Sequence, residues 1–165
     1  MCDKAKTEMT KITEIMEAVR FTASKDATVG EVIKQLTDEQ IGWIPIVDDD
    51  KKLLAYITDG DIIRFISHKR PRSYNYGEHI AIDVDEESFE SKVNSLLNIP
   101  IMEIANRKHK VFAEVDQDID EVADLFRSEN VQFVAVLDEG RVVGVVREGG
   151  IVRHVLAKFL DKEWR

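Results

Sequence analysis

Two polar side chains, Thr58 and Asp61, stand three residues apart directly after a short apolar run at Leu53–Ile57. The run predicts a strand, and the residues after it predict the start of a helix. A hydroxyl and a carboxylate would then lie beside the unpaired backbone N–H groups at the helix start. Together these groups suit a ribose phosphate, and Gly60 would let the backbone approach such a ligand closely.

The same residues also have a purely structural interpretation. Asp61 fits a helix N-cap, and Thr58 is a common strand residue because β-branched side chains favour extended backbone. Taken alone, the segment Thr58-Asp59-Gly60-Asp61 favours this structural role over a binding role. An internal repeat in the chain shifts the balance toward binding.

A phosphate would also need local positive charge, because the chain as a whole is acidic. Basic side chains follow Asp61, and others lie near the C-terminus; they are Arg64, His68, Lys69, Arg70, Arg72, Arg153, His154 and Lys158. A guanidinium can bind a phosphate through two parallel hydrogen bonds. For the run at 68–72 we favour a second interpretation, a solvated helix end whose positive charge stabilises the helix dipole.

The sequence contains none of the common patterns for catalysis or metal binding. It has no glycine-rich phosphate loop with a lysine, no G-x-S-x-G elbow and no cysteine placed to pair with a histidine. The four histidines, at positions 68, 79, 109 and 154, lack the spacing of a metal site. We therefore expect neither an enzyme nor a resident metal ion or cofactor.

An internal repeat is the most informative feature of the chain. Glu31-Val32 recurs as Glu121-Val122, and the segment 44–48 recurs as 134–138, so both elements share an offset of 90. A turn that is one residue shorter in the second copy then reduces the offset to 89. Upstream, we match Met16-Glu17 with Met102-Glu103. The chain therefore contains two copies of one design.

Each copy has the same predicted order of elements. A short strand, at 20–22 or 110–112, precedes an amphipathic helix that begins after Thr28 or Asp118 as its N-cap. Two further strands form a hairpin, and their predicted bounds are 43–47 and 53–57 in the first copy and 133–137 and 142–146 in the second. A second helix then begins near Ile62 or Ile151.

The chain divides into four parts. Residues 1–9 form an N-terminal tail, 10–70 the first copy, 71–98 a connector and 99–165 the second copy. The connector opens with a polar, turn-like stretch and then predicts a helix around Phe89–Leu97. It is an insertion between the repeats.

The duplicated order of elements resembles a pair of CBS domains, the motif named after cystathionine β-synthase. The resemblance rests on the strand Ile44-Pro45-Ile46-Val47-Asp48 and on the strand that runs into Thr58-Asp59-Gly60-Asp61, and it covers nearly all of both copies. It implies an α/β (α+β) fold in which two tandem βαββα motifs form one pseudo-twofold module. The two clefts of such a module often bind adenosine nucleotides, and the module usually regulates something else.

The resemblance also implies roles for particular residues. In the family, the carboxylate at the position of Asp61 accepts hydrogen bonds from the ribose hydroxyls, and the hydroxyl at the position of Thr58 faces the phosphate. The adenine would lie between Phe21-Thr22 on the first strand and Trp43-Ile44-Pro45 on the next. Among the aromatic residues, only Trp43 is a serious candidate for stacking on the base; the others fit a core better.

The second copy departs from this pattern. Arg147 stands at the position of Thr58, and Gly150 stands at the position of Asp61, so the ribose-binding carboxylate is missing. Arg147 either binds a phosphate held at the first cleft or fills a cleft that binds nothing. We therefore expect one adenosine-type site, with Arg64, Arg147 and Arg153 as its candidate basic contacts.

Charge and cysteine content limit the partners and the cellular compartment that fit the protein. The formal net charge is −9 and the pI is near 5.0, which disfavours nucleic acid and anionic lipid as partners. Cys2 is the only cysteine, so a reducing compartment fits best. No segment approaches the roughly 18–20 apolar residues that span a bilayer. We expect a cytoplasmic protein that does not enter the membrane.

The sequence therefore predicts a regulatory module that senses an adenosine nucleotide of the AMP, ADP or ATP type. Two alternatives stay open. One is a ligand-free module for protein–protein interaction or dimerisation, and the other is a sensor of S-adenosylmethionine, NAD or a cyclic dinucleotide. A ligand would regulate a protein target only if it biased the relative position of the two copies.

A homodimer formed through helices is the expected assembly. The second helix of each copy has more apolar residues than one sheet contact needs, at Ile62, Ile63, Phe65 and Ile66 and again along 151–164. Paired CBS modules commonly associate through such helices, and a twofold axis would join the same patch from both chains. A connector helix that folds back over these faces would instead leave a monomer.

Overall fold

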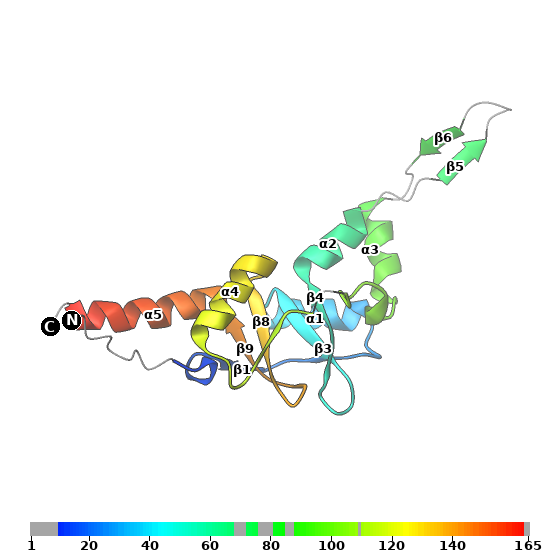
Figure 1. The fold of residues 1–165 in the computed structure, drawn as a ribbon. Helices are drawn as coiled ribbons and strands as arrows, with labels where there is room; N and C mark the ends of the chain where they lie inside the picture. The colour runs from blue at the N-terminus through cyan, green and yellow to red at the C-terminus, as the bar shows by residue number, and fades with distance from the viewer. Residues whose placement is uncertain (1–9, 68–71, 76–80, 85–87, 109, 164–165) are drawn as a thin grey trace.

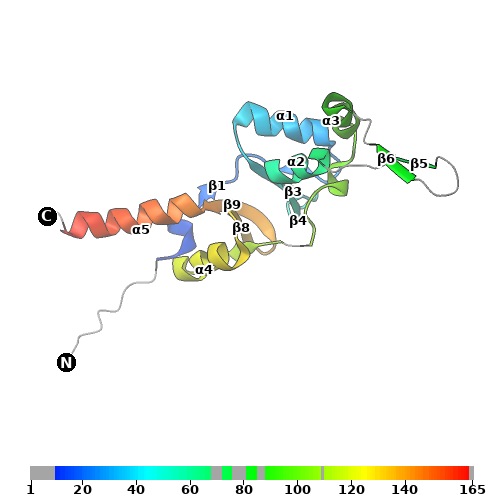
Figure 2. The ribbon, with the colours of Figure 1, turned by 90° about the horizontal axis from the view of Figure 1, so that it is seen from above.

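Two similar α/β units lie side by side in the computed structural model, which describes residues 10–67, 72–75, 81–84, 88–108 and 110–163. The first unit contains β2 (Ala23–Ser24), α1 (Val29–Glu39), β3 (Trp43–Val47), β4 (Leu53–Thr58) and α2 (Asp59–Ser67). The second contains β7 (Phe112–Glu114), α4 (Ile119–Glu129), β8 (Phe133–Asp138), β9 (Arg141–Arg147) and α5 (Glu148–Glu163). In Figure 2 the sheets lie between α1 of one unit and α4 of the other.

The two sheets have equivalent topologies. In the first, β2 runs parallel to β3, which pairs antiparallel with β4. In the second, β7 runs parallel to β8, which pairs antiparallel with β9. A further strand, β1 (Glu17–Ala18), extends the second sheet at β9. The predicted tandem βαββα fold is confirmed.

The first strand of each copy lies about two residues later than the sequence predicts. β2 covers 23–24 instead of 20–22, and β7 covers 112–114 instead of 110–112. The small side chains of Ala23 in β2 and Ala113 in β7 are buried. Alanine has a low strand propensity, so propensity favoured the preceding phenylalanine, whereas burial beneath a helix decides the observed position.

The first helix of each copy begins with a capping box. The side-chain oxygen of Thr28 accepts a hydrogen bond from the Glu31 backbone at 3.3 Å, and the Glu31 carboxylate accepts one from the Thr28 backbone at 2.8 Å. Asp118 and Glu121 form the same box in α4. These reciprocal bonds satisfy backbone donors that a helix start leaves unpaired, so both helices begin where their N-caps predict.

Apolar side chains form a core in each copy and a third cluster between them. In this third cluster, Trp43 and Leu53 of the first copy pack against Ala135 and Leu137 of the second. All four side chains are at most 9% exposed. The two sheets therefore meet through a dry contact, and this burial favours one fixed arrangement of the copies.

Each copy also binds the segment that leads into the other copy. Two short 3-10 turns, η1 (Ile12–Glu14) and η2 (Ile101–Glu103), are equivalent in the two copies. The backbone N–H of Ile12 donates to the carbonyl of Gln117 at 3.0 Å, and that of Ile101 donates to Ala27 at 2.8 Å. The N-terminal segment thus completes the second copy, and the segment after the connector completes the first.

This exchange continues into the sheets. β1 pairs with β9 through Glu17, and Asn106 forms the equivalent bridge with Tyr56 of β4. Asn106 is therefore the counterpart of Glu17. The predicted equivalence of Met16 with Met102 is wrong, because it followed matching residue types, whereas backbone pairing sets the register.

The connector contains the predicted helix and an unpredicted hairpin. Helix α3 (Phe89–Leu97) has the predicted bounds, and its N-cap Ser88 accepts a hydrogen bond from the Ser91 backbone. Strands β5 (Arg72–Asn75) and β6 (Ala81–Val84) pair antiparallel. This hairpin projects away from both units (Figure 1). Its polar opening predicts a turn, so local pattern gave no sign of the strands.

Helix α5 is the longest helix described, with 16 residues. Most of its length extends beyond the sheets (Figure 1 and Figure 2). Val152 and Leu160 are 49% and 55% exposed on it. Within the described residues, neither α5 nor any other helix has both the length and the apolar character that crossing a membrane requires.

Two helical glycines predict opposite effects of one substitution. A Cβ added at Gly30 of α1 would lie 2.9 Å from the Leu97 carbonyl oxygen of α3, whereas one added at Gly150 of α5 would meet no atom within 4 Å. We expect Gly30→Ala to destabilise the protein by roughly 1–3 kcal/mol, because α3 must move. Gly150→Ala should stabilise it by up to about 1 kcal/mol through helix propensity. Urea denaturation measures both changes, and equal effects would contradict the close packing of α3 on α1.

Candidate functional site

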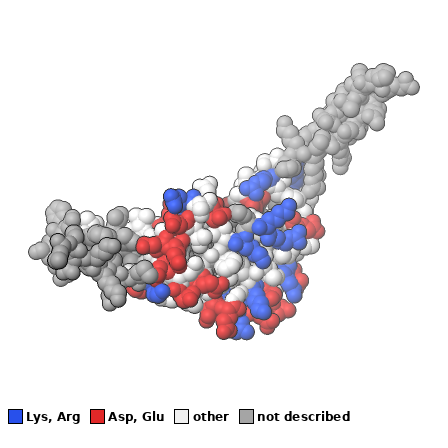
Figure 3. Space-filling view, viewed as in Figure 1, with Lys and Arg blue, Asp and Glu red and all other residues white. Residues whose placement is uncertain are grey.

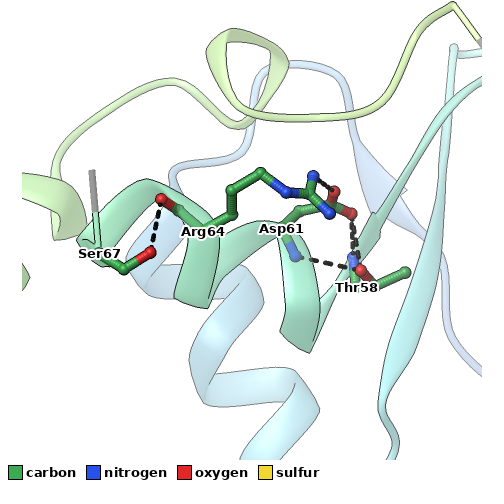
Figure 4. A network of polar contacts seen from close by, with 4 residues as sticks. All are labelled: Thr58, Asp61, Arg64 and Ser67. Atoms are coloured by element: carbon green, nitrogen blue, oxygen red, sulfur yellow. Dashed lines mark hydrogen bonds and ion pairs between the residues drawn. The ribbon is translucent and has the colours of Figure 1, made fainter.

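Thr58 and Asp61 form a compact network where β4 runs directly into α2. The Thr58 hydroxyl donates to the Asp61 carboxylate at 2.7 Å, and the Thr58 backbone N–H donates to the same oxygen at 3.0 Å. The Asp61 backbone N–H donates to the Thr58 hydroxyl oxygen at 3.2 Å (Figure 4). Thr58 is therefore the N-cap of α2. The predicted N-cap role of Asp61 is wrong, because Asp61 occupies position N3 of the helix and completes a capping box with Thr58.

Arg64 engages the other oxygen of the Asp61 carboxylate. Its guanidinium donates to that oxygen at 2.9 Å (Figure 4). The Asp61 side chain is 10% exposed and that of Arg64 is 70% exposed. The guanidinium end of the pair therefore faces solvent, whereas the nearly buried carboxylate would need another donor if Arg64 left it. An added Cβ at Gly60 would touch the Thr58 hydroxyl oxygen at 3.5 Å, an ordinary contact, so the role of Gly60 in the approach of a ligand stays a prediction.

The segment that enters the second copy runs beside the end of β4. Tyr56 and Asn106 exchange two backbone hydrogen bonds, at 3.2 and 2.9 Å. The Tyr56 hydroxyl also donates to the Val111 carbonyl. Burial raises the pKa of this hydroxyl, which therefore remains a donor at physiological pH. Because Tyr56 is two residues before Thr58, this segment borders the Thr58 network.

Three basic residues on this segment were missed by the sequence analysis. Arg107, Lys108 and Lys110 follow Asn106 and are exposed. Figure 3 shows basic side chains gathered toward the half of the visible face that bears α2 and α3, while acidic ones gather toward the α4 half and the lower edge. The signal was the basic run itself, but the antiparallel bridge between Tyr56 and Asn106 shows that this run continues away from Thr58, toward the start of β4.

The predicted adenine-binding strand lies next to Thr58, and its side chains are buried. Trp43 is the register partner of Thr58. Its ring is 9% exposed and stacks on Phe133 of the second copy with 5.1 Å between centroids. Ile44 and Pro45 are also buried in β3. Trp43 thus packs between the copies, and its stacking on a base stays a prediction.

Phe21 and Thr22 precede β2 in the first copy, and both are half-buried. β2 runs parallel to β3 with Ala23 opposite Ile46, so this register continued backwards places them toward Ile44 and Pro45. Thr22 lines an open depression beneath α1. Among the described contacts, none brings Phe21 or Thr22 to the Thr58 network.

The equivalent position in the second copy holds an internal ion pair. The Arg147 guanidinium pairs with the carboxylate of Glu17 on β1, and both side chains are about half exposed. An added Cβ at Gly149 would lie 3.3 Å from the Arg153 guanidinium, which therefore lies over the first turn of α5. Of the roles considered for Arg147, this pairing favours the one in which it fills the second cleft.

A family model for the CBS domain matches the chain twice, at residues 12–68 and 101–157. The chain belongs to the CBS domain family. The two matches begin at Ile12 and Ile101, the residues that start the exchanged segments. The family repeat therefore includes the segment that precedes each copy and pairs with the other copy.

Relatives with this domain differ in length. The protein MJ1225 of Methanocaldococcus jannaschii is 23% identical over 153 residues, which cover 93% of this chain and 44% of that protein. The chain covers only 22% of MJ1232 from the same organism. Hypoxic response protein 1 of Mycobacterium tuberculosis is 24% identical over 147 residues, covering 89% of this chain and 86% of that protein. The chain thus spans less than half of two of these relatives.

Solved structures of CBS-domain proteins share the fold. CBSX2 in complex with AMP has a TM-score of 0.68 and 12% identity, covering 91% of this chain and 98% of that one. The CBS domain pair of MJ0100, in complex with 5′-methylthioadenosine and S-adenosyl-L-methionine, has a TM-score of 0.67 and 26% identity with the same coverage. The architecture is therefore that of a CBS domain pair.

Proposed function

We propose that this CBS pair is a regulatory module that binds an adenosine nucleotide at Thr58 and Asp61. The observation that carries the proposal is the network in which Asp61, a nearly buried carboxylate, has one oxygen held by Thr58 and the other, among the described contacts, by the exposed Arg64 alone. The adenosine ligands of CBSX2 and of the MJ0100 pair support the same ligand class.

Binding would exchange one partner of Asp61 for another. Ribose hydroxyls would donate to the oxygen that Arg64 now occupies, while Thr58 keeps the other oxygen and continues to cap α2. The released guanidinium would then be free to contact the phosphate. The helix start would stay intact, because its capping bonds do not change.

The charge around the site favours a phosphate over a sulfonium. Arg64 lies at the network, where its guanidinium pairs with the Asp61 carboxylate. Positive groups attract the phosphate of a nucleotide and repel the cationic sulfur of S-adenosylmethionine. We therefore propose AMP or a related nucleotide as the ligand.

A ligand in this cleft would sense the arrangement of the two copies. It would contact α2 of the first copy and the segment that leads into the second. A ligand shifts a conformational equilibrium only by its differential affinity for the two states, and contacts to both copies supply such a difference. This coupling supports a regulatory role, with no catalytic step assigned to the chain.

The first prediction concerns the ribose contact. Asp61→Ala should weaken AMP binding at least tenfold, because the ribose hydroxyls lose their acceptor, and isothermal titration calorimetry measures the change. Glu121→Ala is the matched control, since it removes the equivalent capping residue of α4. Both variants should lose about 0.5–2 kcal/mol of stability, but only Asp61→Ala should lose affinity. Unchanged affinity in a folded Asp61→Ala protein would disprove the assignment.

The second prediction concerns the number of sites. Because Arg147 pairs with Glu17 and Gly150 offers no carboxylate, the protein should bind one AMP per chain. Gly150→Asp alone should leave this stoichiometry unchanged. Combining it with Arg147→Thr and Glu17→Asn copies the first cleft into the second and should yield two sites per chain. Calorimetric titration gives the stoichiometry, and two sites in the unmodified protein would contradict the account.

We also propose a homodimer. The apolar surface available for its interface is smaller than the one that the sequence predicts on the second helices. Ile62 and Ile66 are core residues at 8% exposure, so they are not available for a partner. Ile63 and Val152, at equivalent positions in α2 and α5, are 59% and 49% exposed. Helix α3 contacts α2 but leaves Ile63 open. A twofold contact could cover both residues.

The third prediction tests this dimer by mass. Light scattering at micromolar concentration should give twice the chain mass, and Ile63→Glu should dissociate the dimer because burying an unpaired carboxylate is costly. Phe89→Glu, an exposed position on α3 outside the second helices, is the control and should remain dimeric. A monomer mass that does not change with concentration would exclude the dimer.

A further inference from the structure

An open depression lies at the outer edge of the first copy, away from the Thr58 network. It has a volume of about 410 Å³ and runs between β2 and one face of α1. Its polar lining comes from Thr22, Ser24 and Asp26 on one side and from Glu31 and Gln35 on the other. The floor is apolar, with Val32 fully buried.

One wall of this depression is an open sheet edge. Among the described strands, β2 is the last of its three-stranded sheet and pairs with β3 alone. Edge strands present backbone N–H and C=O groups that can pair with an added strand. In β2 the Ser24 carbonyl already accepts the Ala27 N–H at 3.1 Å, so an added strand would use the other edge groups. A groove between a sheet edge and a helix is a recurrent docking place for an extended peptide, with the backbone giving affinity and one side chain giving specificity.

The charge of the depression favours a cationic side chain on the peptide. The two neighbouring lysines are already used, since Lys25 pairs with Asp49 and Lys34 pairs with Asp38. Among the described ion pairs, none involves Asp26 or Glu31. Hydrogen bonds from Thr28 lower the pKa of the Glu31 carboxyl, so it is ionised at physiological pH. Two carboxylates therefore face the depression without a cation.

The second copy differs at the same positions. At the offset of 90 that relates Ala23 to Ala113, the residues equivalent to Thr22 and Gln35 are Phe112 and Leu125. Phe112 is 41% exposed, and Leu125 packs against the second core. Both are larger and apolar, so the polar opening is a property of the first copy alone and not of the repeat.

We propose that this depression docks an extended peptide segment of a partner protein that contains a lysine or arginine. The segment adds as a strand to the edge of β2, and its cationic side chain lies between Asp26 and Glu31. Thr58 lies on β4, at the other edge of this three-stranded sheet, so the module can hold a partner while Thr58 and Asp61 remain accessible.

The test uses the full chain labelled with ¹⁵N and the peptide acetyl-Thr-Val-Lys-Val-Thr-amide. Amide chemical shifts of Thr22–Ser24, Asp26 and Glu31 should change and saturate with peptide. A peptide with norleucine in place of lysine should bind about tenfold more weakly, the effect expected for losing one charge-assisted pair. Free n-butylamine, which has the charge without the strand, should not shift the β2 amides.

Substitutions taken from the second copy give the decisive variants. Thr22→Phe with Gln35→Leu places residues that the fold already accepts at 112 and 125, and should abolish the shifts without unfolding the protein. Asp26→Asn should weaken binding. Asp116→Asn, the equivalent change between β7 and α4 of the second copy, should not. The proposal is overturned if the lysine peptide gives no saturable shifts, if the norleucine peptide binds equally well, or if the double variant still binds.

Discussion

The backbone pairing that the two copies exchange is the constraint on which the rest of the structure depends. Ile12 bonds to the second copy, and Ile101 bonds to the first. Each copy therefore needs a segment from outside its own βαββα unit to complete its backbone hydrogen bonds, so the two copies fold as one module. The stacked rings of Trp43 and Phe133 fill the contact between them. As a result, the end of β4 always lies beside the segment that enters the second copy, and this juxtaposition creates the candidate site.

Asp61 caps α2, and in the proposed function the same carboxylate also binds the ribose. Its bonds to Thr58 cap α2, and its bond to Arg64 is exposed. The equivalent helix, α5, runs for 16 residues although Gly150 replaces the carboxylate. The helix start therefore does not require a carboxylate at this position. Its presence in the first copy is better explained by a ligand than by capping alone.

Local patterns in the sequence were enough to predict most of the elements. Helical spacing predicted the bounds of α3, and the β-branched run at 43–47 predicted β3, because both signals lie within a few residues. The first strands, the hairpin at 72–84 and the exchange were not predictable in this way. Their stability comes from backbone pairing or burial, and the exchanged pairs lie far apart in the chain, from 50 residues for Tyr56 and Asn106 to 128 for Glu17 and Val145.

A crystal structure of the chain grown with AMP tests the central claim most directly. The account predicts AMP at the end of β4, with its ribose hydroxyls within hydrogen-bonding distance of Asp61 in place of the Arg64 guanidinium. The phosphate should lie near Thr58 and the Arg64 guanidinium, and the second cleft should keep the Arg147–Glu17 pair. AMP bound elsewhere, or an Asp61–Arg64 pair that is unchanged in crystals grown with millimolar AMP, would contradict it.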